Sequence, residues 1–286
     1  MTFACVLRCL RGACLAITVL SGTATAGAAP AARPSRIVSL NMCTDELVLR
    51  LADPQRIASV TWLSQDPRNA NMAEVARRFP ANQGLAEQVL GFGPDLVVAG
   101  AYTTRATVSL LGRAGVAVRE FGVPRNLAEM KAQIAEMAQV LGEPARGEAL
   151  LAGIEQRLRM LAARRIDRPL RAIVLRPSGF TVGRGSLVDE ILTRAGLVNI
   201  AAELGVESYG QIALETVALG RAEILILNET PDGPPSLAHE ILHHPVLERL
   251  GDRLKLVALP SRLWTCAGPS VLDAIELLVR AVEEKR

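Results

Sequence analysis

The sequence contains one pattern with the spacing of a catalytic zinc site. His239, Glu240 and His243 match HExxH, in which two histidines one helical turn apart bind zinc and the glutamate acts as the base. Several prolines precede the pattern closely, Pro245 ends any helix two residues after it, and no histidine beyond His244 is available as a third ligand. We therefore interpret the pattern as adventitious, and we expect no metal ligands and no catalytic residues.

Other motifs of enzyme chemistry do not occur in the sequence. It has no Walker-type phosphate loop, no GxSxG, and no Ser, His and Asp arrangement of usable spacing. We therefore predict a protein that is not an enzyme and that needs no cofactor. Two alternatives stay open: a metal-dependent hydrolase built on HExxH, and a bare zinc- or manganese-binding protein. The second would need a cluster of His, Asp and Glu in strand-end loops that contain no histidine.

Aromatic side chains are scarce, and they gather near the expected ends of strands. Of nine aromatic residues, five lie in or beside such loops or in other loops between elements: Trp62, Tyr102, Phe180, Tyr209 and Trp264. Ligands of doubly wound α/β sheets bind beyond the carboxyl ends of the strands, and an aromatic ring there offers a large apolar face to a planar or bulky chelate. We predict that these five side chains contact a ligand. For any one of them, the alternative is that it caps the core of its lobe.

Arginines lie in or near the same loops, at Arg105, Arg176, Arg184 and Arg262. Arg176 and Arg262 are the stronger ligand candidates because each follows an expected strand by about one residue. A guanidinium group binds carboxylate, catecholate or hydroxamate oxygens through forked hydrogen bonds. Together with the aromatic residues, these arginines favour an anionic ligand.

The N-terminal residues have the composition of a secretory signal peptide. A short basic start with Arg8 and Arg11 precedes an apolar run at 13–20, and Ala24 and Ala26 suit a cleavage site. The apolar run is shorter than the ~20 residues that a membrane-spanning helix needs. We predict a signal peptide at 1–26 and a disordered leader at 27–35.

Cleavage after Ala26 leaves two cysteines, Cys43 and Cys266, in an oxidising compartment. Cys43 lies in the first loop of the first half of the chain, and Cys266 lies in the last loop of the second half. Three alternatives follow: a disulfide across a cleft, free thiols that contact a soft metal, or two unrelated buried thiols.

The elements that position these residues follow an α/β pattern that occurs twice. Strands are expected at 36–40, 57–60, 96–99 and 116–119, and again at 172–175, 224–227 and 254–259. Between the two sets, apolar residues recur at helical spacing, and residues 142–144 divide this stretch into two helices. The second helix is long enough to join two lobes rigidly. The fold class is therefore α/β, with an N-terminal lobe at 36–142, a connecting helix at 143–168 and a C-terminal lobe at 169–286.

Composition excludes two further classes of protein. The formal net charge is +3 and the sequence has no basic run, so it has no electrostatic signature for nucleic acid. Half of the residues are hydrophobic, which is far from the composition of a disordered chain.

The sequence resembles the periplasmic substrate-binding proteins of ABC importers for ferric siderophores, cobalamin and haem. The resemblance lies in an ordered set of segments: 36–45 (RIVSLNMCTD), 51–60, 93–98 (GPDLVV), 111–118 and 244–247 (HPVL). The resemblance implies two Rossmann-like lobes joined by a single long rigid α-helix, with one metal chelate in the cleft between the lobes. Among the chelates of that family, the arginines and aromatic residues above favour an anionic ferric siderophore slightly over neutral cobalamin. It also implies a periplasmic location and delivery of the ligand to a permease dimer with its ATPase. We expect the protein to be a monomer.

Two glutamates match positions that dock on permease arginines in that family. Glu87 and Glu215 also align in an ungapped internal match, because each precedes a second acidic residue by eight positions and a strand follows directly. The alternative is that each glutamate simply favours the dipole of its own helix. The resemblance favours the docking role.

Overall fold

The computed structural model describes residues 33–164, 168–219, 221–229, 244–246 and 254–285. The HExxH pattern and the predicted signal peptide lie outside these residues. No helix in the described ranges is long and apolar enough to span a membrane.

The first half of the chain forms a five-stranded parallel sheet with the order β3-β2-β1-β4-β5. Its strands are β1 Ile37–Ser39, β2 Ile57–Thr61, β3 Ala81–Asn82, β4 Leu96–Gly100 and β5 Ala117–Phe121. Every residue of β4 is buried, as expected for a parallel strand covered on both faces. The helices that connect these strands are α1 Met42–Leu51, α2 Ala73–Ala76, α3 Ala86–Gly91 and α4 Arg105–Arg113.

The second half contains a four-stranded parallel sheet with the order β11-β10-β6-β8. Its strands are β6 Leu170–Leu175, β8 Leu197–Asn199, β10 Ile224–Glu229 and β11 Lys255–Pro260. Two further strands, β7 Phe180–Val182 and β9 Tyr209–Gln211, lie between β6 and β10 in the sequence and form a small antiparallel pair. The helices are α7 Leu187–Arg194, α8 Ile200–Glu203, α9 Leu214–Leu219 and α12 Val271–Lys285. These parallel sheets confirm the predicted α/β class.

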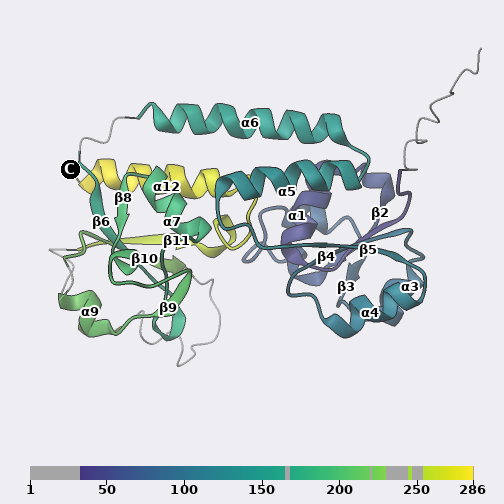
Figure 1. Ribbon diagram of the computed structural model, residues 1–286, viewed down its shortest axis with the longest axis horizontal. Coiled ribbons are helices and arrows are strands. Elements are labelled where there is room, and N and C mark those ends of the chain that lie inside the picture. The colour runs from purple at the N-terminus through teal and green to yellow at the C-terminus, as the bar shows by residue number, and fades with distance from the viewer. Residues whose placement is uncertain (1–32, 165–167, 220, 230–243, 247–253, 286) are drawn as a thin grey trace, which may run out of the picture. The chain divides into compact units, whose positions relative to one another are not determined.

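Between the sheets in sequence, α5 Leu127–Val140 and α6 Pro144–Ala162 pack side by side (Figure 1). The Asn126 side chain caps α5 by accepting a hydrogen bond from the Glu129 N–H at 2.8 Å. Gly142, with φ +69°, follows the end of α5, and Pro144 opens α6. The two predicted helices are therefore separated at the predicted glycine and proline.

Apolar residues of both sheets and of these helices form one large buried cluster. In it, Met130, Ile134 and Met137 of α5 are fully buried, as are Ile275 and Leu278 of α12. This packing holds the carboxyl ends of the first sheet's strands in a defined arrangement.

Candidate functional site

A cavity of about 460 Å³ lies at the carboxyl ends of the strands of the first sheet. Most of its wall comes from the segments that follow β1, β2, β4 and β5, as expected for the ligand edge of a parallel sheet. Tyr209, Thr265 and Ala267 add wall residues from the second half of the chain. The remaining lining residues are Leu40, Asn41, Met42, Cys43, Thr44, Leu47, Thr61, Leu63, Gln83, Gly84, Gly100, Ala101, Tyr102, Thr103, Thr104, Phe121, Gly122, Val123, Pro124 and Gln133.

None of the described residues that line this cavity is charged at neutral pH, and none is a histidine. Its polar groups are amides, hydroxyls and two phenols, which donate and accept hydrogen bonds without net charge. The amides belong to Asn41, Gln83 and Gln133. Such a wall suits a ligand whose contacting groups are themselves neutral and polar.

The start of α1 positions one part of the wall. Asn41 caps this helix, because its side chain accepts a hydrogen bond from the Cys43 N–H at 2.9 Å. Gly100 allows this arrangement: a Cβ there would lie 2.6 Å from Asn41 Cγ. The Thr44 and Ser39 hydroxyls form a buried hydrogen bond of 2.8 Å. Local capping therefore sets the positions of Asn41 and Thr44 in the wall.

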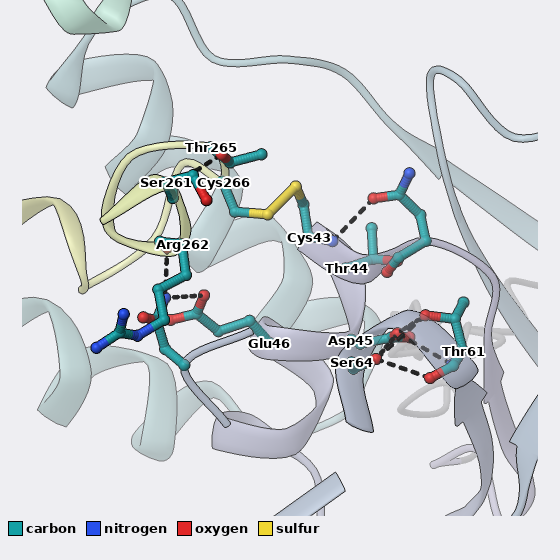
Figure 2. Close-up of a disulfide and its surroundings, with 12 residues drawn as sticks. Cys43, Thr44, Asp45, Glu46, Thr61, Ser64, Ser261, Arg262, Thr265 and Cys266 are labelled. Atoms are coloured by element: carbon teal, nitrogen blue, oxygen red, sulfur yellow. Dashed lines mark hydrogen bonds between the residues drawn. A yellow bond between two sulfur atoms is a disulfide. The ribbon is translucent and has the colours of Figure 1, made fainter. Parts of the chain in front are cut away.

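Asp45 lies next to two wall residues, Thr44 and Thr61, and is fully buried. Its Oδ2 accepts hydrogen bonds from the Thr61 N–H at 3.0 Å and from the hydroxyls of Thr61 and Ser64, as Figure 2 shows. Its Oδ1 has no hydrogen-bond partner among the described residues. Burial raises the pKa of the Asp45 carboxyl, and the hydrogen bonds it accepts oppose that rise. The sequence analysis did not select Asp45, although an acidic residue in the first turn of a helix that follows a buried strand was a usable signal.

The two cysteines form a disulfide (Figure 2). Cys43 and Cys266 have Cα atoms 5.0 Å apart although they are separated by 223 positions in the sequence. Of the three alternatives left open by the sequence, the structure contains the disulfide. Cys43 lines the cavity, and Cys266 lies between two further lining residues, Thr265 and Ala267.

Two of the five predicted aromatic ligand residues line the cavity. Tyr102 and Tyr209 are there, 84% and 61% exposed. Trp62 and Phe180 are half exposed but outside the lining, although Trp62 stands between the lining residues Thr61 and Leu63. Trp264 is buried in the core cluster.

The arginines considered from sequence do not line the cavity. Arg176 lies over the ring of Trp264, 5.4 Å from its centroid. Arg262 borders a separate small pocket, where its backbone oxygen accepts a hydrogen bond from Asn71 Nδ2 at 2.7 Å. Arg105 pairs with Glu120 at 3.2 Å, and Arg184 donates to the Ala202 carbonyl at 3.0 Å.

The two glutamates predicted to dock on a permease lie in short helices. Glu87 and Glu215 are both exposed, and each lies in the first turn of a six-residue helix, α3 and α9. Within the described part of the chain, no group of three or more His, Cys, Asp and Glu side chains is arranged to hold a metal ion.

Comparison with known proteins gives a family match and two curated relatives. A sequence model of the family described as periplasmic binding protein matches residues 37–250. Two cobalamin-binding proteins of Halobacterium salinarum strains are 25% identical to the chain over 204 residues, which is 70% of this chain and 55% of each relative. The match thus spans about half the length of these curated relatives.

Solved structures share the fold at low sequence identity. The periplasmic haem-binding protein RhuT of Roseiflexus sp. RS-1 is 24% identical, with a TM-score of 0.69, and the match covers 87% of this chain and 99% of that one. The vitamin B12-binding protein BtuF of Vibrio cholerae is 20% identical, with a TM-score of 0.67 and coverage of 88% and 98%. The haem-binding protein HutB of the same species is 19% identical, with a TM-score of 0.71 and coverage of 86% and 98%.

The family and these neighbours are binding proteins, which confirms the prediction that the chain is not an enzyme. The family match extends from β1 through β10, so it includes the first sheet, strands β6, β8 and β10 of the second sheet and most of the segments that line the cavity. The chain therefore belongs to the periplasmic binding protein family.

Proposed function

We propose that the chain is the solute-binding component of an ABC importer and that it captures a metal chelate of the corrinoid class. Part of the ligand lies in the 460 Å³ cavity, and the loaded protein delivers the ligand to a permease dimer with its ATPase. The uncharged lining of the cavity is the observation that carries this choice. The names of the curated relatives, cobalamin-binding proteins, agree with it.

The lining favours a corrinoid over the other metal chelates for an electrostatic reason. A corrin ring carries neutral amide side chains, which pair with amides, hydroxyls and phenols such as those of Asn41, Gln83, Gln133, Tyr102 and Tyr209. Haem carries two propionates and ferric catecholates carry several anionic oxygens. Burying several anionic groups against lining residues that include no cation is costly. This preference reverses the slight preference for a siderophore that the arginines suggested from sequence.

A ligand panel tests the proposal. Isothermal titration with cyanocobalamin, hemin, ferrichrome and a ferric catecholate is expected to give the tightest binding for cyanocobalamin. Tyr102→Ala and Tyr209→Ala should each weaken it by about five- to thirtyfold, as loss of a central aromatic contact does. Trp62→Ala and Phe180→Ala, outside the lining, should have smaller effects.

Met160→Ala is the matched control, because Met160 is 57% exposed on α6 and remote from the lining. It should leave every affinity unchanged. If hemin or a siderophore binds more tightly than cyanocobalamin, the ligand is that chelate and not a corrinoid. Stoichiometric zinc or manganese retained after dialysis would favour the bare-metal alternative instead.

The proposal includes docking through Glu87 and Glu215. Both carboxylates are exposed, and neither forms an ion pair with another described residue, so both are available to arginines of a permease. The double variant Glu87→Lys/Glu215→Lys should abolish uptake of labelled ligand in cells and leave affinity in solution intact. The control Glu136→Lys/Glu148→Lys makes the same charge change on exposed positions of α5 and α6 and should leave uptake normal.

Location and assembly are part of the same proposal. Residues 1–26 direct export to the periplasm and are then removed, and the mature protein is a monomer. N-terminal sequencing of the protein from a periplasmic fraction should begin at Gly27. A cytoplasmic protein that starts at Met1 would contradict this part of the proposal alone.

A further inference from the structure

Arg176 is a mostly buried cation without an anionic partner. It follows β6, and its Nε atom is fully buried with no hydrogen-bond partner. The side chain forms no ion pair or hydrogen bond with the described residues. Its guanidinium group stacks on the ring of Trp264. Although Nε is buried, Arg176 as a whole is partly exposed. The forked end of the guanidinium is therefore open to a ligand.

Leaving such a group unpaired destabilises the folded protein. A guanidinium removed from water loses hydration that a cation–π contact replaces only in part. The loss of hydration lowers the pKa of Arg176, and the nearby Tyr209 opposes this effect. Another mostly buried arginine has a counter-ion: Arg56, whose side chain is 15% exposed, forms an ion pair with Glu143 at 2.5 Å. The unpaired state of Arg176 therefore calls for a binding role.

Arg176 is adjacent to the wall of the cavity that comes from the second half of the chain. Its electrostatic neighbour Tyr209 lines the cavity. Its stacking partner Trp264 directly precedes another lining residue, Thr265. The carboxyl end of β6 is also the edge of the second sheet at which ligands of such folds bind.

We infer that Arg176, held by Trp264, is an anion subsite at this wall, and that it binds one phosphate or carboxylate group of a ligand whose body lies in the uncharged cavity. The guanidinium donates forked hydrogen bonds to two oxygens of that group. The inference rests on the proposed function and refines it, because it requires a ligand with a neutral body and a localised anionic group. A corrinoid has its anion in the phosphodiester of the nucleotide loop, whereas haem has propionate carboxylates.

Two pairs of ligands separate these sources. Cyanocobalamin contains the phosphodiester, and dicyanocobinamide has the same ring without the nucleotide loop. Hemin and its dimethyl ester differ only in the propionate charges. Arg176→Met should weaken cyanocobalamin by about 10- to 100-fold, as expected for hydrogen bonds to a charged group, and leave dicyanocobinamide within about twofold. If the anion is a propionate, the same contrast appears between hemin and its ester.

Two further variants guard against a merely structural effect. Arg176→Lys keeps the charge without the fork and should lie between the wild type and Arg176→Met. Arg280→Met removes an arginine that is 63% exposed on α12 and should change neither ligand pair. Equal weakening of both members of a pair by Arg176→Met would assign Arg176 a structural role and overturn the inference.

A direct anion titration keeps the test independent of the corrinoid proposal. The chain has two tryptophans, so Trp62→Phe leaves Trp264 as the only indole. Its fluorescence should change saturably with inorganic phosphate, but not with sodium chloride at matched ionic strength, and the response should vanish when Arg176→Met is added. A phosphate response that survives Arg176→Met overturns the inference. If the wild type binds no corrinoid, the proposed function fails, but the hemin pair and the phosphate titration still test the anion subsite. The subsite is overturned as well if Arg176→Met weakens hemin and its dimethyl ester equally and phosphate does not change the fluorescence of Trp264.

Discussion

Asp45 combines complete burial with one carboxylate oxygen that is hydrogen-bonded and one that is not. Burial favours the protonated carboxyl, so its pKa in the folded protein lies above the ordinary value of 3.8. An acid with a raised folded pKa binds more protons when folded than when unfolded. Its contribution therefore lowers the free energy of unfolding as the pH rises from about 3.8 towards the raised pKa.

This sign gives a prediction for Asp45→Asn. The neutral amide does not titrate, so the stability of the variant relative to the wild type should increase as the pH is raised from about 4 to neutrality. Urea unfolding of both proteins at several pH values measures the difference. All other titrating groups are common to the two proteins and cancel in it. A difference that is constant with pH would mean that Asp45 does not titrate in this range in the folded protein.

At the scale of elements, the close approach of α5 and α6 depends on Gly147. A Cβ at this position would overlap the Cβ of Ala138 on α5. Gly147→Ala is therefore expected to lower the free energy of unfolding by about 1–3 kcal/mol, the usual cost of overpacking a close contact. Urea unfolding measures the change directly.

Gly153 provides the matched control on the same helix. It is exposed, and a Cβ there meets no atom within 4 Å. Gly153→Ala should raise the free energy of unfolding by about 0.5–1 kcal/mol through helix propensity alone. If both variants are stabilised equally, α5 and α6 do not pack as closely as described.

The elements also explain what the sequence could and could not predict. The long strands such as β4 and the break between α5 and α6 were predictable, because a buried apolar run and the Gly142 to Pro144 signal are local. Strands β3, β7, β8 and β9 were missed, because two or three residues are too short to show an alternating pattern.

Loop residues at strand ends were predictable as a group, and Tyr102 lines the cavity from such a loop, whereas Tyr209 lines it from the first position of β9. Their individual environments were not predictable, since Trp264 is buried by packing of residues remote in sequence and Arg176 stacks on it from 88 positions away.

At the scale of the whole molecule, the Cys43–Cys266 disulfide joins the first turn of α1 to the segment that precedes α12. The bond closes a loop of more than two hundred residues, and its Cys43 end lines the cavity. A crosslink over so long a loop restricts the unfolded chain strongly, and a typical disulfide contributes about 2–5 kcal/mol to stability. The same bond limits how far the two parts of the wall can separate when ligand enters or leaves.

Removing the bond should therefore change both stability and ligand kinetics. Cys43→Ser/Cys266→Ser should lower the free energy of unfolding by about 2–5 kcal/mol and speed ligand release, because the wall segments are no longer tied together. Urea unfolding and stopped-flow tryptophan fluorescence measure the two effects. Dithiothreitol should convert the parent protein to the behaviour of the double variant and leave the variant itself unchanged, because the variant lacks the Cys43–Cys266 bond. If dithiothreitol changes the parent protein and the double variant equally, its effect does not arise from the Cys43–Cys266 bond. Unchanged ligand release in the double variant would show that the disulfide stabilises the fold without restricting the cavity.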